Sequence, residues 1–398
     1  MSVHSAPARR GTNLPRVGDF NESVVLEAIR RSANGMSRVE LARATGLSAQ
    51  TVSNICRRLL DRGLVEETGK QSTGAGKPRT ILTINPVSRF AIGVHLDPAV
   101  VTYVVLDLEG RVVEGLRRPT PEVVDPDQTM AEIGESVGTL VERAGVEQDR
   151  ILGLGIAAPG PIDAAAGLVV DPPQLAGWVR VPLRDHLADA TGLPVILDKD
   201  VTAAAIAERW AGAAANTGNF LFFYLGTGSG MGIVVENSIV RGASANAGEV
   251  GGLDANCTTR ALVEEAVATG VLDASHTTTS PHASEQSLQV LTGLAEQGHV
   301  GATAILDGWA GRVARGVAAA ATLLDSDLVV FGGPIWPQLS SWFLPIATDV
   351  INRSPFVEKM HPTTVTETAL GADVGAIGAA CLVLDRTLSP QPESLMFS

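Results

Sequence analysis

The segment from residue 195 to 252 constrains the fold of this 398-residue chain more than any other. A short apolar run, 195–197, leads into Asp198-Lys199-Asp200, and a second, 220–224, leads into a glycine-rich loop. Glycines directly after a strand let backbone N–H groups approach an anion, because no Cβ stands in the way. The loop is therefore a phosphate-type loop or its relic, with a tight β-hairpin as the alternative. Its candidate residues are Gly226, Thr227, Gly228 and Gly230.

Charge is distributed unevenly along the chain. The net charge is −13, yet residues 1–90 contain 14 Lys and Arg against 7 Asp and Glu, while the remainder contains 16 against 36. A basic head on an acidic body indicates that only the head meets a polyanion, because the body would be repelled from it. Nucleic acid is the expected partner of the head.

The basic head has the pattern of a helix-turn-helix. A first helix is expected from Asn21, and a second begins at a capping box, Ser37-Arg38-Val39-Glu40, and ends near Gly46. Ser48 then caps a third helix with an apolar stripe and a polar opposite face. Two helices joined by a Gly-containing turn are typical of DNA-binding heads, in which the second helix enters the major groove.

A glycine-rich hairpin follows the third helix. Two expected strands, 64–67 and 80–84, flank a linker that contains Lys77 and Arg79. A basic hairpin directly after a recognition helix is typical of a wing that reaches the backbone or the minor groove. A solubilising loop is the alternative. The residues expected to contact DNA are Ser48, Gln50, Thr51, Asn54, Arg57, Lys77 and Arg79.

The acidic body reads as a mixed α/β structure. Apolar runs that predict strands alternate with glycine turns and amphipathic helices, and this alternation is the pattern of layered α/β domains. Asp200 ends one such strand, where α/β sheets place ligand groups, although it would serve equally well as the N-cap of the next helix. The expected elements are strands 90–96, 100–107, 112–113, 151–156 and 328–331 and helices 127–144, 183–190, 301–324 and 371–384.

The order of these motifs resembles the ROK family of repressors and sugar kinases. Lys199-Asp200 matches the family's Asn-Asp before a helix, 226–232 matches its second phosphate loop, and 247–252 matches its Ala-Gly-Glu-x-Gly-His turn without the His. The head also resembles that of ROK repressors, through the wing step Gly76-Lys77-Pro78. The resemblance implies a two-lobed sugar-kinase-like body, of the actin and hexokinase type, behind a winged helix-turn-helix.

The resemblance also implies a sugar site. Gly160, Gln174, Asp200 and Glu249 match the positions that line the family's sugar pocket, and Asp200 would be the general base if the chain were a kinase. Lys199 replaces an Asn that binds sugar hydroxyls in the family, so a standard hexose is not implied at that point.

Other positions depart from the kinase pattern. His95 stands where active members have an Asp, and Asp97-Pro98-Ala99 where they have Gly-Gly-Thr. A carboxylate and a proline without an N–H disfavour the phosphates of a nucleotide, so no cofactor is expected. Cys257 is one thiol where zinc-bearing members have a cysteine pair, and one thiol cannot complete a tetrahedral site, so no metal is expected.

These observations predict a cytoplasmic DNA-binding regulator, a repressor, that does not associate with a membrane. Its expected partners are operator DNA and a sugar or sugar phosphate, and its expected assembly is a homodimer or a dimer of dimers. The alternatives are an ATP-dependent sugar kinase that uses Asp200, or a regulator without a ligand. The expected parts are an arm, 1–20; the winged helix, 21–85; a first lobe, 86–200, completed by the helix 371–385; a second lobe, 201–370; and a tail, 386–398.

Overall fold

A computed structural model describes residues 14–71, 79–120, 125–173, 175, 177–251, 257–276, 281–355 and 357–390. The chain divides into two compact units. The first, called the head unit, comprises 1–90 with 107–111 and 384–398, and the second, called the body, comprises 91–106 and 112–383. Among the described residues, no helix combines the length and the apolar character needed to cross a membrane.

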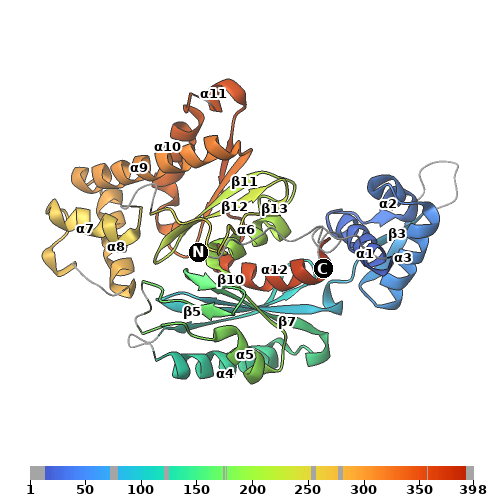
Figure 1. Cartoon of the computed structure of the whole chain (residues 1–398). Helices are drawn as coiled ribbons and strands as arrows, with labels where there is room; N and C mark the ends of the chain where they lie inside the picture. The colour runs from blue at the N-terminus through green and yellow to red at the C-terminus, as the bar shows by residue number, and fades with distance from the viewer. Residues whose placement is uncertain are drawn as a thin grey trace, which may run out of the picture. The chain divides into compact units, whose positions relative to one another are not determined.

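The head unit is a winged helix (Figure 1). Within its described residues up to 90, helices α1, α2 and α3 pack with a three-stranded sheet in the order β1-β3-β2. Val25, Leu41 and Leu59, one from each helix, are fully buried together with Leu82 of the sheet, so the apolar stripes form one small core. The elements are α1 (Leu14–Arg30), β1 (Met36–Ser37), α2 (Arg38–Thr45), α3 (Ala49–Asp61), β2 (Val65–Gln71) and β3 (Arg79–Ile84).

The predicted caps of the head are confirmed. The Ser37 hydroxyl accepts a hydrogen bond from the Glu40 N–H, and the Glu40 carboxylate accepts one from the Ser37 N–H, which forms a complete capping box. Gly46 ends α2 in the left-handed conformation, with φ at 70°. The Ser48 hydroxyl accepts from the Thr51 N–H at 3.1 Å and begins α3.

The expectation of an arm over residues 1–20 is wrong for residues 14–20. Helix α1 begins at Leu14, seven residues before the expected cap at Asn21. Pro15 does not interrupt this helix, because a proline in the first turn lacks only an N–H that would have had no helical partner. Residues 1–13 lie outside the described residues.

The first lobe of the body is built on a five-stranded sheet in the order β10-β7-β4-β5-β6. Helices α4 and α5 cover one face, and α6 and α12 lie on the other (Figure 1). The strands are β4 (Phe90–Leu96), β5 (Val100–Asp107), β6 (Val112–Pro119), β7 (Ile151–Ala158) and β10 (Val195–Lys199), and the helices are α4 (Pro126–Ala144), α5 (Leu183–Thr191), α6 (Asp200–Ala211) and α12 (Val374–Leu388).

Helix α12 packs on this sheet through small residues. A Cβ placed on Gly155 of β7 would lie 1.7 Å from the Ala379 carbonyl oxygen, and one placed on Gly93 of β4 would lie 2.0 Å from that of Ala376. The helix backbone therefore rests directly on the strands, which only glycine permits.

The second lobe is built on another five-stranded sheet, in the order β13-β12-β11-β14-β15. Strand β11 is buried on both faces: Leu221, Phe223 and Leu225 face the core beneath α9, while the alternate residues face α6. The strands are β11 (Phe220–Leu225), β12 (Ser229–Val235), β13 (Ser238–Ile239), β14 (Leu328–Gly332) and β15 (Thr364–Glu367), and the helices are α7 (Thr259–Ala268), α8 (Pro281–Glu296), α9 (Val300–Leu324), α10 (Ser340–Asn352) and α11 (Val357–Met360). The predicted combination of an α/β body and a winged helix is confirmed.

The glycine-rich loop proves to be a tight β-hairpin. Strands β11 and β12 are antiparallel, and Leu225 pairs with Ser229, so only three residues form the turn. Gly230, expected in a phosphate loop, lies in β12, where a Cβ would come within 2.5 Å of Val201 in α6. This glycine therefore permits close helix–strand packing, and only Gly226, Thr227 and Gly228 remain in the loop.

Candidate effector-binding site and DNA-binding surface

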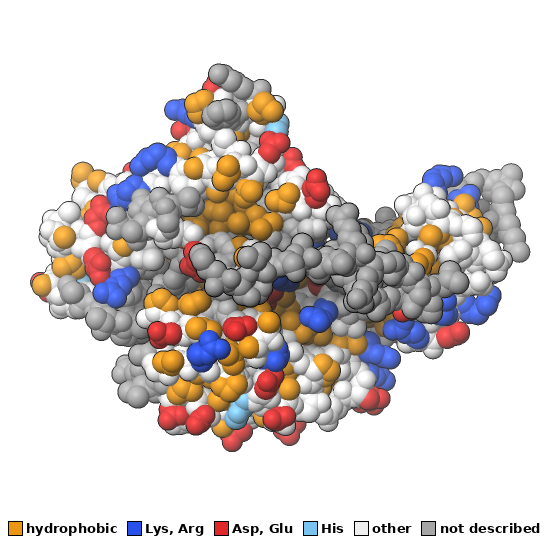
Figure 2. Space-filling view, viewed as in Figure 1, with side chains coloured by type: hydrophobic (Ala, Val, Ile, Leu, Met, Phe, Trp, Pro, Cys, Tyr) orange, Lys and Arg blue, Asp and Glu red, His pale blue; other side chains and the backbone are white. Residues whose placement is uncertain are grey.

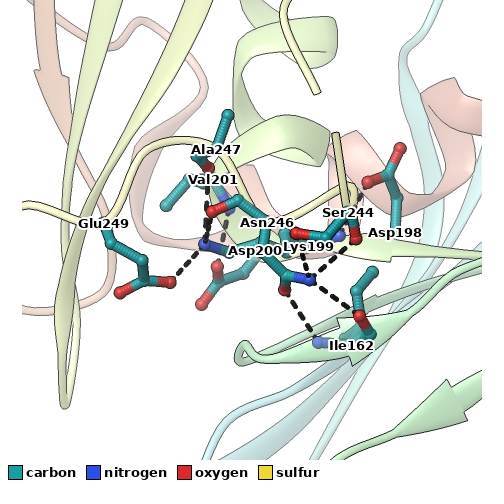
Figure 3. A network of polar contacts seen from close by, with 9 residues as sticks. All are labelled: Ile162, Asp198, Lys199, Asp200, Val201, Ser244, Asn246, Ala247 and Glu249. Carbon is teal, nitrogen blue, oxygen red and sulfur yellow. Dashed lines mark hydrogen bonds and ion pairs between the residues drawn. The ribbon is translucent and has the colours of Figure 1, made fainter. Parts of the chain in front are cut away.

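Three of the four expected effector residues converge at the carboxyl end of β10, and Figure 3 shows two of them, Asp200 and Glu249, beside Lys199. Asp200 follows the last residue of this strand, and Glu249 reaches the same place from the second lobe. Gly160 lies beside them, since a Cβ there would be 2.9 Å from Lys199 Cε and 3.2 Å from Glu249 Oε1. Gln174, the fourth, lies outside the described residues.

Lys199 is the centre of this group of polar residues. Its side chain is only 3% exposed, and its ammonium group forms an ion pair with Glu249, whose side chain is 66% exposed. The ammonium also lies 3.4 Å from the carbonyl oxygen of Ala247 and 3.5 Å from that of Asn246. A buried ammonium needs a nearby anion, and the described residues supply it through Glu249.

Asp200 is the first residue of α6, and its carboxylate accepts a hydrogen bond from the Val201 N–H at 2.7 Å. Lys199, and not Asp200, occupies the N-cap position. Burial raises the pKa of Asp200 to about 7, although the Val201 N–H and the Lys199 charge act in the opposite direction. The protonated and ionised forms are therefore both present near neutral pH, and the carboxyl can donate or accept a hydrogen bond.

Two contacts that the sequence did not predict hold the Glu249 segment against the first lobe. The Asn246 side chain accepts from the Ile162 N–H and donates to the Ile162 carbonyl, both at 2.8 Å. Arg241 Nε donates to the buried carboxylate of Asp198 at 2.9 Å. The sequence indicated Asp198, because it is a charged residue at the end of a predicted strand. No local sequence pattern indicated Asn246 or Arg241.

Asp97, one of the residues that depart from the kinase pattern, lies close enough to Asp200 for its negative charge to help raise the pKa of that carboxyl. Asp97 Oδ1 accepts from the Ala99 N–H at 2.8 Å and from the Thr227 hydroxyl at 2.9 Å. Its other oxygen would lie 3.4 Å from a Cβ on Gly226. A buried carboxylate therefore occupies the space next to the hairpin turn.

His95 lies within β4 and is buried. Its Nε2 lies 3.2 Å from the Tyr224 hydroxyl. Burial lowers the pKa of His95 and raises the pKa of Tyr224 well above its ordinary value. Both side chains are therefore neutral, and they form a buried contact between the two lobes.

The expected DNA-contacting side chains lie on the outer face of α3 and at the base of the wing. Ser48, Gln50, Asn54 and Arg57 are exposed, and Thr51 is half-buried. Arg58 instead forms an ion pair with Glu22 of α1 at 2.8 Å. Arg79 is exposed at the start of β3, and Lys77 lies outside the described residues. Figure 2 shows Lys and Arg side chains, in blue, on the surface of the head unit.

Among the described residues, no three His, Cys, Asp or Glu side chains come together as a metal site would require. Cys257 is buried, and its carbonyl accepts a hydrogen bond from the Ser229 hydroxyl at 3.0 Å.

A winged helix joined to a two-lobed α/β body with a polar site at the end of β10 defines a class of protein in which a head that can bind DNA accompanies a sugar-kinase-like fold. Two family models match the chain: the MarR family over residues 19–73 and the ROK family over residues 91–386. The chain belongs to the ROK family.

Relatives of two kinds are similar to this chain. A xylose repressor of Caldicellulosiruptor bescii is 25% identical over 390 residues, which cover 93% of this chain and 96% of the repressor. A glucokinase of Thermotoga maritima is 28% identical over 318 residues, which cover 74% of this chain and 97% of the kinase. The crystal structure of a ROK family transcriptional regulator, a homologue of the E. coli MLC protein, matches 94% of this chain and 97% of its own at 20% identity, with a TM-score of 0.76.

Proposed function

We propose that this chain is a transcriptional regulator, a repressor, that binds operator DNA through its winged helix and a sugar-type effector through the site at the end of β10. The observation that carries this proposal is the head itself, a capped recognition helix whose outer face presents Gln50, Asn54 and Arg57. Amide side chains at such positions suit base edges, and a guanidinium group suits phosphates. The similarity to a xylose repressor over 93% of the chain supports the same conclusion.

The body supports effector binding without phosphoryl transfer. The Asp97 carboxylate lies beside the hairpin turn at Gly226, so a nucleotide phosphate that approached this turn would meet a like charge. The Thr227 hydroxyl donates a hydrogen bond to the Asp97 carboxylate. We therefore expect no tight binding of ATP.

The proposal also includes localisation in the cytoplasm and assembly as a homodimer or a dimer of dimers.

Sugar phosphorylation is the second candidate function, because Asp200 is retained. A general base is most effective when its pKa lies near the working pH, and the pKa of Asp200 is about 7. A coupled assay of nucleotide hydrolysis with a panel of sugars separates the two functions. The regulator proposal predicts no turnover above the level of an Asp200→Asn variant, while turnover that this substitution abolishes would establish a kinase.

A direct test of the head uses the full chain and double-stranded DNA. We expect binding that weakens steeply as salt is raised, because phosphate contacts release counterions. An absence of affinity for duplex DNA at low salt would contradict the proposed function.

A further inference from the structure

The ion pair between Lys199 and Glu249 is asymmetric in its exposure. The Lys199 side chain is 3% exposed and the Glu249 side chain is 66% exposed. Glu249 can turn into water at small cost, since most of its surface is already solvated. Lys199 cannot, and a buried ammonium left without an anion is strongly unfavourable. When Glu249 turns away, Lys199 loses its ion-pair partner and keeps only the more general attraction of Asp198 and Asp200, so an anionic group of a ligand suits the position of Glu249.

An exchange of this kind requires only the Glu249 side chain to move. The backbone beside it is fixed, because the Gly248 carbonyl accepts from the Met231 N–H at 2.8 Å and Gly230 bridges to Glu249. The Asn246 side chain anchors the same segment to Ile162. Rotation of this one exposed side chain would thus remove the ion-pair partner of Lys199 while the backbone beside it stays in place.

The neighbouring groups suit a polyhydroxylated ligand with one negative charge. Asp200 is adjacent and half-buried, and its carboxyl can exchange hydrogen bonds with a hydroxyl group. The other buried acid, Asp198, already pairs with Arg241. Lys199 is therefore the cation in this group whose counter-ion can be replaced.

We propose that Lys199 binds an anionic group of the effector, and that Glu249 occupies the position of that group in the free protein. The effector is accordingly an acidic sugar, a polyol that carries a carboxylate or a phosphate. This inference rests on the proposed function, because it names the class of effector that the same site takes.

Titration calorimetry of the full chain with matched probes tests the inference. The probes are D-xylose against D-xylonate, and D-glucose against D-gluconate and D-glucose 6-phosphate. We expect at least one acidic probe to bind at least about tenfold more tightly than its neutral counterpart, because it alone supplies a counter-ion to Lys199. The two acidic glucose probes distinguish a carboxylate from a phosphate. Equal or tighter binding of the neutral probes would overturn the inference.

Substitutions of Glu249 and of Lys199 are expected to have opposite effects on the binding of acidic sugars. Glu249→Gln removes the competing anion, so we expect acidic sugars to bind about three- to tenfold more tightly. If Glu249 instead contacted sugar hydroxyls directly, the same substitution would weaken binding, and this result would contradict the inference. Lys199→Met removes the partner of the solvated Glu249 carboxylate and a charge that acts on Asp198 and Asp200. Asp198 keeps its ion pair with Arg241, so the variant is expected to fold, with the preference for acidic probes lost. A retained preference in this variant would also overturn the inference.

Glu264→Gln is the matched control, since Glu264 is an exposed carboxylate that pairs with Arg260 at 2.8 Å on α7. It should leave the binding of every probe unchanged. Binding to duplex DNA is measured separately in the same preparations. Intact DNA binding with a preference for neutral sugars would overturn only the inference. A lack of DNA affinity would contradict the proposed function, and calorimetry would still decide the ligand preference.

Discussion

Asp200 remains partly protonated at pH values at which an exposed aspartate is fully ionised. Its pKa is about 7 in the folded chain, with burial as the main cause, against about 3.9 in an unfolded chain. The folded state therefore binds more protons than the unfolded state between these two values. The contribution of Asp200 to stability is fully present below about pH 4 and is lost as the pH rises through about 7.

An Asp200→Asn variant isolates this effect, because asparagine does not titrate. The free energy of unfolding of the variant minus that of the wild type should rise by on the order of 2 to 4 kcal/mol from pH 4 to pH 7.5. Urea titrations at several pH values measure this difference, and the other buried acids, such as Asp198 and Glu208, cancel in the subtraction. A difference that does not change with pH would show that Asp200 titrates normally.

The sequence predicted which residues of the site meet but not how they pair. Gly160 and Asp200 lie together because the parallel strands β7 and β10 end at the same edge of the first sheet, whereas Glu249 reaches them from the second lobe. The ion pair between Lys199 and Glu249 joins residues 50 positions apart. It depends on Asn246, whose contact with Ile162 sets the path of the loop and leaves no periodic signal in the sequence.

At the scale of elements, the contact of α12 with the first sheet depends on glycine. A Gly155→Ala substitution would place a methyl group 1.7 Å from the Ala379 carbonyl oxygen, and the helix must shift to relieve this clash. We expect a loss of about 2 to 4 kcal/mol in the free energy of unfolding, at or above the usual cost of overpacking. Denaturant unfolding monitored by circular dichroism measures it.

Gly138 provides the matched control for this substitution. It lies within α4, and a Cβ there would have no neighbour within 4 Å. Gly138→Ala should leave stability unchanged or raise it by up to about 1 kcal/mol, because alanine favours helix. Equal effects of the two substitutions would contradict the packing described for α12.

The recognition helix α3 gives a prediction about DNA. Arg57 is exposed on its outer face, and we expect Arg57→Ala to reduce the slope of log K against log salt by about 0.9, which corresponds to one lost phosphate contact. Arg150→Ala, which removes an exposed arginine of the body paired with Glu147, is the control and should not change the slope. An unchanged slope for Arg57→Ala would exclude this residue from contact with phosphate.

Local signals decided which elements could be predicted. The capping box at Ser37 fixed the start of α2, because both of its hydrogen bonds lie within four residues. The start of α1 at Leu14 was missed, since Pro15 and a basic composition suggested an arm. The polar composition of residues 275–286 gives no sign of helix α8, which begins at Pro281 and buries Leu288 and Leu291 in the core of the second lobe. Packing against the core of the second lobe decided the case of α8.

At the scale of the whole molecule, the distribution of charge differs between the two units. The basic residues are concentrated in the part of the sequence that folds as the winged helix, and the acidic excess lies in the body. A duplex is therefore attracted to the head and repelled by the rest of the chain.

Effector binding and DNA binding should be linked thermodynamically. We expect a bound effector to change the affinity for operator DNA by about 10- to 100-fold, which is 1 to 3 kcal/mol of coupling. Reciprocity requires DNA to change the affinity for the effector by the same factor. Calorimetric titrations of the effector, with and without saturating DNA, measure this factor, and an equal effector affinity in the two titrations would contradict the expected coupling.

The central claim is that the head reads a specific duplex sequence. Selection of bound duplexes from a random pool by the full chain, at moderate salt, tests this claim most directly. We expect enrichment of one sequence motif, and loss of that enrichment when Gln50 and Asn54 are both replaced by alanine. A pool that remains random after repeated selection with the intact chain would contradict it.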